Sequence, residues 1–451
     1  MMIRYLKSKM ARRLTRLVSA GLLVGIGACG FEDPLRVADP GTLTDDELSG
    51  VGSVQATING MIGAYGEAHD DYTLYSGMFT DEFILAGTFP TRLEVDDRRI
   101  VRDNATVTGS VYEPIHVARA LADNSLASFE EGLTNPDLAS VEDLLREGIA
   151  LAYLYGGYTR ILLSELYCES ALDAGEYVLS NARAQQALDV LGNVAAAASA
   201  AGRGDVADAA MVGIARANLF LGNDGAAMTA AQSVSAGFQP FLAEFSENAN
   251  AQFNEVHSFT FGRGGQVIRW TVGDGTTAAR NNEAWPYFAE WVSLGLIDPD
   301  PGLTAFNANV PVKLQQIYLS GASSITVASP AEADMIAAET LIRGGTAQNL
   351  SDANDIVNGY RTARGLADID FAAMANLTER LTAFVQEKAR ETWLSGLRQG
   401  DLRRLRERDG IDLYPASTSG QSMDQICFPV PQQEIDNNTN TNRCNVAGVC
   451  S

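Results

Sequence analysis

The chain has 451 residues, with 33 Lys and Arg against 56 Asp and Glu, a net charge of −23, and 46% hydrophobic residues. This length and hydrophobic content suffice for a globular core, and the 20% of charged residues is too low for a disordered chain. So acidic a surface repels nucleic-acid phosphates and anionic lipids, which disfavours nucleic-acid binding.

The N-terminal segment has the pattern of an export signal. Residues 1–16 carry six basic residues and no acid, and residues 17–28 are apolar but too few to span a bilayer as a helix. This stretch ends in Ile26-Gly27-Ala28-Cys29, which resembles a bacterial lipobox. We therefore expect a lipoprotein signal peptide over 1–28 and acyl chains on Cys29 that hold the protein at a membrane surface. An ordinary secretory signal with a chance cysteine is the alternative.

Residues 29–50 are predicted to be a lipidated tether, and residues 51–436 a helical domain. Several long segments carry apolar residues at helical spacing. A capping box at 140–143 predicts the start of a central helix that continues through Leu162. Ala-rich helices separated by glycine turns are predicted at 181–201, 205–221 and 224–236.

Small residues at two predicted helix crossings indicate closely packed helix pairs. The segment 215–231 resembles half of a tetratricopeptide unit, and a degenerate second copy begins at 333–345. Between them, residues 238–325 are rich in Gly, Pro and Asn and hold most of the tryptophans, so we expect loops and short strands there. The predicted fold is mainly α: an irregular tetratricopeptide-like scaffold of helix pairs with a loop-rich insertion.

The C-terminal third carries three motifs in a fixed order. Residues 333–366 contain Ala333-Asp-Met-Ile-Ala-Ala-Glu339 and Asn358-Gly-Tyr-Arg361. A helix is predicted over 376–404, with Glu387-Lys-Ala-Arg-Glu391 and Arg398-Gln-Gly-Asp-Leu-Arg403 along it. We expect its charged residues to form ion pairs three or four positions apart on one helix, and Trp393 to lie in the core. The third motif is Phe428-Pro-Val-Pro-Gln-Gln-Glu-Ile435, in which the prolines favour an extended segment.

Together with the lipobox, the Asn59–Tyr65 helix and the Thr80-Asp81-Glu82 segment, these motifs resemble the ordered blocks of the SusD/RagB family of outer-membrane nutrient-uptake lipoproteins. Two positions depart from the family pattern, with Ser395 in place of a glutamate and Asn438-Thr439 in place of a closing Asn-Pro. The resemblance implies a lipid-anchored protein on the bacterial outer membrane. Such a protein captures an oligosaccharide, or in some members a peptide, and acts as the lid of a SusC-like TonB-dependent transporter.

The resemblance also implies a binding protein and not an enzyme. The sequence has no GxSxG elbow, HExxH helix or phosphate loop, and no catalytic residue or cofactor is predicted. Two alternatives remain: a helical-repeat adaptor that binds a protein partner, and a surface glycoside hydrolase with paired carboxylates. Asp298-Pro-Asp300-Pro301 offers two carboxylates for a structural calcium ion, but without the regular ligand ladder of an EF-hand a loop turn is favoured.

Sugar binding requires flat aromatic faces and polar groups around them. Trp285 and Tyr287 are the preferred candidates, because Pro286 between them favours an exposed turn. The alternative for each aromatic is core packing, since tryptophan is on average largely buried. The remaining ligand-binding candidates are Trp291, Trp270, Phe89 and Asp81.

Export makes disulfides the expected state of the other cysteines, and the candidates are Cys168, Cys427, Cys444 and Cys450. Four cysteines allow three pairings, among which Cys444 with Cys450 is marginally favoured. Cross-linking would hold down the Asn/Thr/Cys-rich tail at 437–451. Metal binding is disfavoured because the sequence has no CxxC spacing.

Overall fold

The computed structural model describes residues 51–80, 82–85, 87–248, 252–261, 270–272, 288–302, 313–415 and 425–440. For 270–272, 288 and 289 it describes the backbone only. The chain divides into a unit Met1–Gly50 and a unit Val51–Ser451, and the description below concerns the second. Within the described ranges no helix is both long and apolar enough to cross a bilayer.

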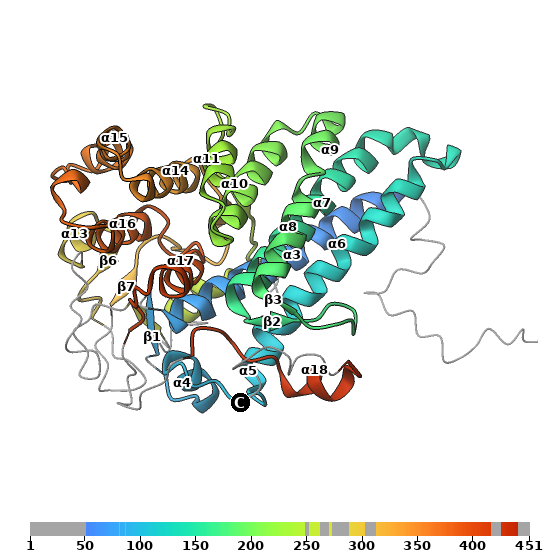
Figure 1. Cartoon of the computed structure of the whole chain (residues 1–451). Helices are drawn as coiled ribbons and strands as arrows, with labels where there is room; N and C mark the ends of the chain where they lie inside the picture. The colour runs from blue at the N-terminus through green and yellow to red at the C-terminus, as the bar shows by residue number, and fades with distance from the viewer. Residues whose placement is uncertain are drawn as a thin grey trace, which may run out of the picture. The chain divides into compact units, whose positions relative to one another are not determined.

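Helices dominate the described residues (Figure 1). The α-helices, in chain order, are α3 (Val51–Phe79), α4 (Pro90–Asp96), α5 (Ala105–Val107), α6 (Glu113–Gly132), α7 (Glu142–Leu166), α8 (Ser180–Leu191), α9 (Val194–Ala201), α10 (Gly204–Phe220), α11 (Asp224–Gln232), α12 (Glu255–Phe261), α13 (Phe288–Ser293), α14 (Pro330–Gly344), α15 (Ala347–Ala363), α16 (Leu377–Glu391), α17 (Arg398–Arg404) and α18 (Gln432–Asn437). Shorter 3-10 or π segments are η1 (Thr108–Tyr112), η2 (Pro136–Val141), η5 (Phe371–Ala373) and η6 (Leu405–Asp409).

The strands are short and pair in twos. They are β1 (Phe83–Leu85), β2 (Glu169–Ser170), β3 (Val178–Leu179), β4 (Phe241–Ala243), β5 (Trp270–Val272), β6 (Ile297–Asp298), β7 (Leu314–Gln315) and β8 (Ile325–Ala328). The antiparallel pairs are β1 with β5, β2 with β3, β4 with β8, and β6 with β7. Apart from β2–β3, each described pair uses a strand of the predicted insertion, as expected for that segment.

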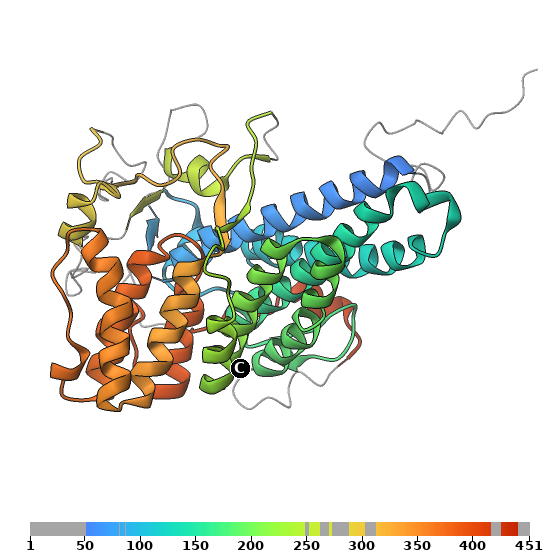
Figure 2. The ribbon, with the colours of Figure 1, turned by 90° about the horizontal axis from the view of Figure 1, so that it is seen from above.

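Two groups of helices meet along α3. Helices α6 and α7 run beside α3, and α8 packs on α7. The C-terminal helices α14–α17, in orange and red, gather near the C-terminal end of α3 (Figure 2). One apolar cluster surrounds the N-terminal half of α3 with α6–α11, a second surrounds its C-terminal half with the insertion, and a third joins α14, α15 and α16. The predicted mainly helical scaffold is therefore confirmed.

The predicted helix pairs are present, with caps of the expected kind. Helices α10 and α11 pack together across a turn in which Gly222 has a φ of 78°. Helices α14 and α15 form the second pair: Ser329 caps α14, Thr346 caps α15, and Gly345 ends α14 with a φ of 67°. Because only glycine adopts positive φ without strain, these glycines allow the sharp reversals that bring each pair together.

Helix α7 confirms the prediction of a central helix, since most of its residues from Leu145 onward are buried. The predicted capping box is wrong, however. Ser140 lies within η2, and α7 begins after Val141 with no side-chain cap. The chain turns helical earlier because Asn135 caps η2 at the amide of Asp137.

The single helix predicted over 376–404 is also wrong. Asn376 caps α16 as expected, but α16 ends at Glu391 and α17 starts only at Arg398. Between them Gly396 has a φ of 76° and leaves no room for a side chain, since a Cβ there would lie 2.9 Å from the ring of Tyr72. The break therefore fits the chain against α3. Trp393 is 3% exposed, which confirms its predicted place in the core.

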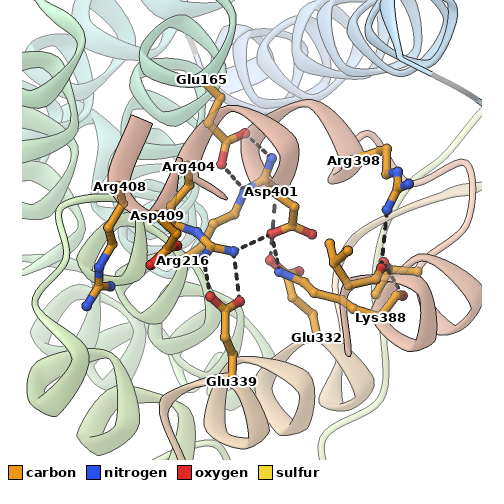
Figure 3. Close-up of polar contacts among 12 residues, drawn as sticks. Glu165, Arg216, Glu332, Glu339, Lys388, Arg398, Asp401, Arg404, Arg408 and Asp409 are labelled. Carbon is orange, nitrogen blue, oxygen red and sulfur yellow. Dashed lines mark hydrogen bonds and ion pairs between the residues drawn. The ribbon is translucent and has the colours of Figure 1, made fainter. Parts of the chain in front are cut away.

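The charged residues of this region form a buried cluster that joins helices (Figure 3). Two of the predicted same-helix pairs are also present, Glu387 with Arg390 in α16 and Asp401 with Arg404 in α17. Lys388 of α16 donates to Asp401 of α17 at 2.7 Å. Arg404 also donates to Asp401, at 2.9 Å, and makes a two-pronged contact with Glu339 of α14. Arg343 of α14 bridges Glu339 and Asp409 of η6. The cluster therefore ties α14, α16 and α17 together.

A second part of the cluster connects these helices to the rest of the domain. Arg216 of α10 makes a two-pronged contact with Glu165 of α7, and Tyr72 of α3 donates to the same carboxylate at 2.9 Å. Burial raises the pKa of the nearby Glu332 to about 7, although the positive charge of Arg216 opposes the shift. Helix α17 packs tightly against α7 at Gly400, because a Cβ built there would lie 2.6 Å from the carboxyl carbon of Glu165.

The C-terminal segment is attached to the domain by a disulfide. Cys168, just after α7, is bonded to Cys427, 259 positions later, with their Cα atoms 5.5 Å apart. Next to it, the Phe428 amide donates to the Leu166 carbonyl at 2.8 Å. The other candidate cysteines, Cys444 and Cys450, lie outside the described residues.

We expect Arg216→Met to lower the free energy of unfolding by about 3–5 kcal/mol, because the buried carboxylates of Glu165 and Glu332 lose their cation. Chemical denaturation at neutral pH measures the change. Arg146→Met is the matched control: Arg146 is paired only with the exposed Glu142 in the described structure, and the loss there should stay below about 1 kcal/mol. Equal losses for both variants would contradict a special role for the buried cluster.

Replacing both Cys168 and Cys427 by alanine should lower the free energy of unfolding by about 2–5 kcal/mol, because the disulfide closes a long loop in the unfolded chain. Denaturation midpoints of wild type and variant, each with and without dithiothreitol, test this. Reduction should move the wild-type midpoint towards that of the variant. An oxidised wild type no more stable than the variant would show that this bond contributes nothing.

Candidate functional site

A pocket of about 880 Å³ lies between α3 and the stretches 244–246 and 252–259, and we call it the α3 pocket. The segment that follows α11, in yellow-green, passes over α3 in Figure 2, and α12 and β4 both contact that helix. The pocket is lined by Asn59, Ile62, Gly63, Gly66, Glu67, Asp70, Asp71, Tyr75, Ser110, Glu244, Phe245, Ser246, Gln252, Phe253, Glu255 and Phe259. One helix therefore forms its floor, and the insertion forms its walls.

Part of the floor of the α3 pocket is helix backbone that carries no side chain. The lining residues of α3 recur every three or four positions and so share one face of the helix. Gly63 and Gly66 lie on that face, and a Cβ built on Gly63 meets nothing within 4 Å. The open space above Gly63 therefore leaves room for a ligand group against the helix.

Carboxylates dominate the polar lining. The charged residues among the described lining are all acidic: Glu67, Asp70, Asp71, Glu244 and Glu255. Asp70 is only 1% exposed. Its Oδ2 accepts from the backbone amide of Glu255 at 2.7 Å, whereas its Oδ1 has no hydrogen-bond partner among the described residues. Burial, followed by the charge of Asp71, raises the pKa of Asp70 well above its usual range. A buried acid with an unsatisfied oxygen is typical of a binding site.

Aromatic rings form the apolar part of the lining. Tyr75 comes from α3 and Phe259 from α12, and Phe245 and Phe253 lie in the segment before α12. The guanidinium of Arg92 stacks on Phe259, with its carbon 4.5 Å from the ring centroid, and also lies 4.8 Å from the ring centroid of Phe89. Phe259 is thereby fixed at the pocket wall. Rings beside carboxylates and amides are the groups that bind sugars.

A second pocket, of about 630 Å³, adjoins the first and shares Ile62 and Glu244 with it. It lies between α7, the start of α10 and the segment around β4, and Tyr155 is among its lining residues. Here Arg203 pairs with two of the acids, Glu147 and Asp205, while Asp208 and Glu244 also line the pocket. Of the two pockets, only the α3 pocket has no basic residue among its described lining residues.

The predicted ligand residues that the structure describes lie in different environments. Phe89 is 48% exposed and does not line the α3 pocket, but the guanidinium of Arg92 contacts both Phe89 and the lining residue Phe259. Trp291 is 1% exposed and lies 4.4 Å from the ring centroid of Trp393, so it is a core residue without a face to offer a ligand. Trp270 sits in β5 opposite Leu85 of β1. The remaining predictions lie outside the described residues: Cys29, Asp81, Trp285 and Tyr287.

The carboxylates of the α3 pocket are absent from the sequence-based predictions. Their signal was available in the spacing of Gly60, Gly63 and Gly66 along a helix that also carries Asp70-Asp71. The aromatic residues of α12 gave no comparable signal, because the contact of α12 with α3 depends on tertiary structure. The predicted loop turn near Asp298 is confirmed, since its Oδ1 accepts from the amide of Asp300 at 3.1 Å.

The described residues contain one cluster of side chains with the spacing of metal ligands, Cys168, Glu407 and Cys427. Its two cysteines are joined in the disulfide, so their sulfur atoms are not thiolate ligands. This cluster therefore does not define a metal site.

The fold is similar over most of its length to solved structures of SusD superfamily proteins. One from Bacteroides thetaiotaomicron has a TM-score of 0.63 at 14% identity, covering 86% of this chain and 98% of that one. One from Bacteroides fragilis has a TM-score of 0.61 at 15% identity, covering 87% and 99%. Surface glycan-binding protein A from Bacteroides uniformis has a TM-score of 0.61 at 14% identity, covering 85% and 97%. No protein-family model matches the sequence, and no curated protein matches it significantly.

These likenesses confirm the fold that the sequence motifs indicated. The chain has the SusD fold across most of its length, although few residues are identical.

We expect Asp70→Asn to stabilise the protein at neutral pH. With its pKa raised in the folded state, Asp70 keeps its proton where the unfolded chain has lost it, so this group lowers stability as the pH rises above about 4. Asparagine removes the titration and still accepts from the Glu255 amide. Urea midpoints should therefore rise at neutral pH and stay unchanged well below about pH 4.

The control for this measurement is Asp368→Asn, which removes the charge of an exposed carboxylate. Its urea midpoint should equal that of the wild type at both pH values. A neutral-pH midpoint for Asp70→Asn at or below the wild-type value would show that the buried Asp70 carboxyl does not destabilise the fold.

Proposed function

We propose that this protein is a SusD-type binding protein that captures an oligosaccharide in the α3 pocket without cleaving it. The observation that carries the proposal is the coincidence of a SusD fold with a pocket lined by carboxylates and aromatic rings. Carboxylates accept hydrogen bonds from sugar hydroxyls, and ring faces stack on sugar C–H faces. The similar protein from Bacteroides uniformis is described as a surface glycan-binding protein, which supports the same ligand class.

The rest of the proposal concerns location and partner. The lipobox ending in Cys29 supports a lipid anchor on the bacterial outer membrane, with the domain at the cell surface. A tether of about twenty residues leaves the domain free to open and close over a SusC-like TonB-dependent transporter, as the family resemblance implies. Phe89, Trp270, Trp285, Tyr287 and Asp81 remain proposed ligand contacts.

The first experiment measures binding and hydrolysis separately. Purified protein is screened against an array of oligosaccharides and peptides, and bound glycans are then incubated with it and assayed for new reducing ends. We expect micromolar binding of an oligosaccharide and no new ends. Hydrolysis would favour a glycoside hydrolase, and selective peptide binding would keep the uptake role while replacing the cargo. Recovery of a large β-barrel protein with the native lipoprotein would support the transporter as partner.

The pocket itself is tested by Gly63→Leu. The leucine side chain would occupy the open space above the floor, and it also favours helix more than glycine does, so the fold should be kept. We expect the affinity for the best oligosaccharide of the array to fall at least about tenfold, equivalent to about 1.4 kcal/mol. Isothermal titration calorimetry measures it.

Gly359→Leu is the matched control, because Gly359 lies inside α15 with nothing within 4 Å of a built Cβ and does not line the pocket. It should bind as the wild type does. If Gly63→Leu binds equally well, the ligand site lies elsewhere on the protein.

A further inference from the structure

The charge of the α3 pocket has a further consequence for its ligand. The five acidic lining residues come from separate stretches of the chain: Glu67, Asp70 and Asp71 from α3, Glu244 from the segment after β4, and Glu255 from α12. They are therefore brought together by folding, unlike the exposed acids of a single solvated helix face. Such a concentration of one sign of charge in a hollow attracts cations and repels anions.

The burial of Asp70 distinguishes this cluster from an ordinary patch of acidic surface. Its side chain lines the pocket and is 1% exposed, yet Oδ1 has no hydrogen-bond partner in the described structure. The carboxyl groups around it are Asp71 and Glu67 on its own helix and Glu255 on α12, all of like charge. A cationic donor entering the pocket would satisfy the open oxygen and offset the mutual repulsion.

The adjoining pocket provides an internal comparison. There the protein supplies its own cation, because Arg203 pairs with Glu147 and Asp205. In the α3 pocket the nearby Arg92 contacts the rings of Phe89 and Phe259 and the lining residue Tyr75, and it is not itself among the lining residues. The two pockets share Glu244 but differ in whether a described lining residue carries positive charge.

The aromatic lining suits the same kind of ligand. A protonated amine is attracted by the faces of Tyr and Phe rings, and Tyr75, Phe245, Phe253 and Phe259 line the pocket together with the carboxylates. The same rings stack on sugar C–H faces, and this combination favours an amino sugar over a simple metal ion. The acids lack the close mutual spacing of metal ligands, since the described cluster with that spacing lies elsewhere.

We propose that the α3 pocket selects oligosaccharides that carry protonated amino groups, such as chains of non-acetylated amino sugars, over neutral and anionic ones. This inference rests on the proposed function and specifies its cargo. The amine would sit among Glu67, Asp71 and Glu255 in front of Asp70, with the sugar rings against the aromatic wall. Uronic-acid and sulfated glycans would be excluded by like-charge repulsion.

The test is calorimetric titration of the full domain with matched probes. These are a glucosamine oligosaccharide, its N-acetylated form of the same length, a glucose oligosaccharide with the same linkage, a galacturonate oligosaccharide and a lysine tripeptide. We expect the glucosamine chain to bind at least about tenfold more tightly than its acetylated form, since one charge-assisted contact suffices for that ratio. Added salt should weaken the preference, because ions screen exposed charges.

Two variants assign the selectivity to the pocket. Asp71→Asn should remove most of the difference between the amine and its acetylated form, and Glu67→Gln, at an exposed position where folding is not at risk, should reduce it. Asp368→Asn removes an exposed carboxylate outside the pocket lining and should leave the preference unchanged.

The outcomes distinguish this inference from the proposed function. Equal or tighter binding of the acetylated, glucose or galacturonate chain would overturn the amine selectivity while the capture of oligosaccharides stands. Tight binding of the lysine tripeptide without any oligosaccharide would overturn the amino-sugar assignment together with the glycan function. A preference that survives in both pocket variants would place the selectivity outside the α3 pocket and so overturn the inference.

Discussion

The domain depends on one buried carboxylate, that of Glu165, which is ion-paired with Arg216 and accepts a hydrogen bond from Tyr72. It joins α3, α7 and α10 at one carboxylate, and the neighbouring pairs around Glu339 and Asp401 extend the connection to α14, α16 and α17. Desolvating so many charges is unfavourable unless every partner is in place. The cluster therefore specifies one mutual arrangement of the helices, which apolar packing between small side chains leaves less defined.

The same helix serves the cluster and the pocket. Tyr72 of α3 faces Glu165, whereas Asp70 and Asp71, directly before it, line the pocket. Adjacent residues on a helix point in different directions, so one rigid element presents carboxylates to a ligand while its other side is fixed by buried ion pairs. The acidic lining is thus positioned by the scaffold, and the walls of the insertion close around it.

Local signals explain which parts of the structure could be predicted from sequence. Periodic apolar residues and glycine turns gave α7, α10, α11 and α14, and Asn376 gave the start of α16, because these depend on neighbours in the chain. The break at Gly396 was missed, since it is required by the ring of Tyr72, more than three hundred positions away. Trp291 was assigned to the ligand because composition cannot tell an exposed ring from one packed on Trp393. Glu255 and Glu244 join the acids of α3 only through the docking of α12 and the β4 segment on that helix.

The glycine floor of the α3 pocket affects how the pocket would discriminate between ligands. Inside a helix the amides are already bonded, so the strip around Gly63 offers a guest no hydrogen-bond donor, only the second lone pairs of its carbonyl oxygens. It discriminates mainly by thickness: a planar ring fits against it, and a bulky substituent pointing toward the helix does not. The pattern of hydroxyls and charges is left to the surrounding side chains. If the pocket binds as proposed, its ligand preference would change through mutations in the insertion, with the helical frame left untouched.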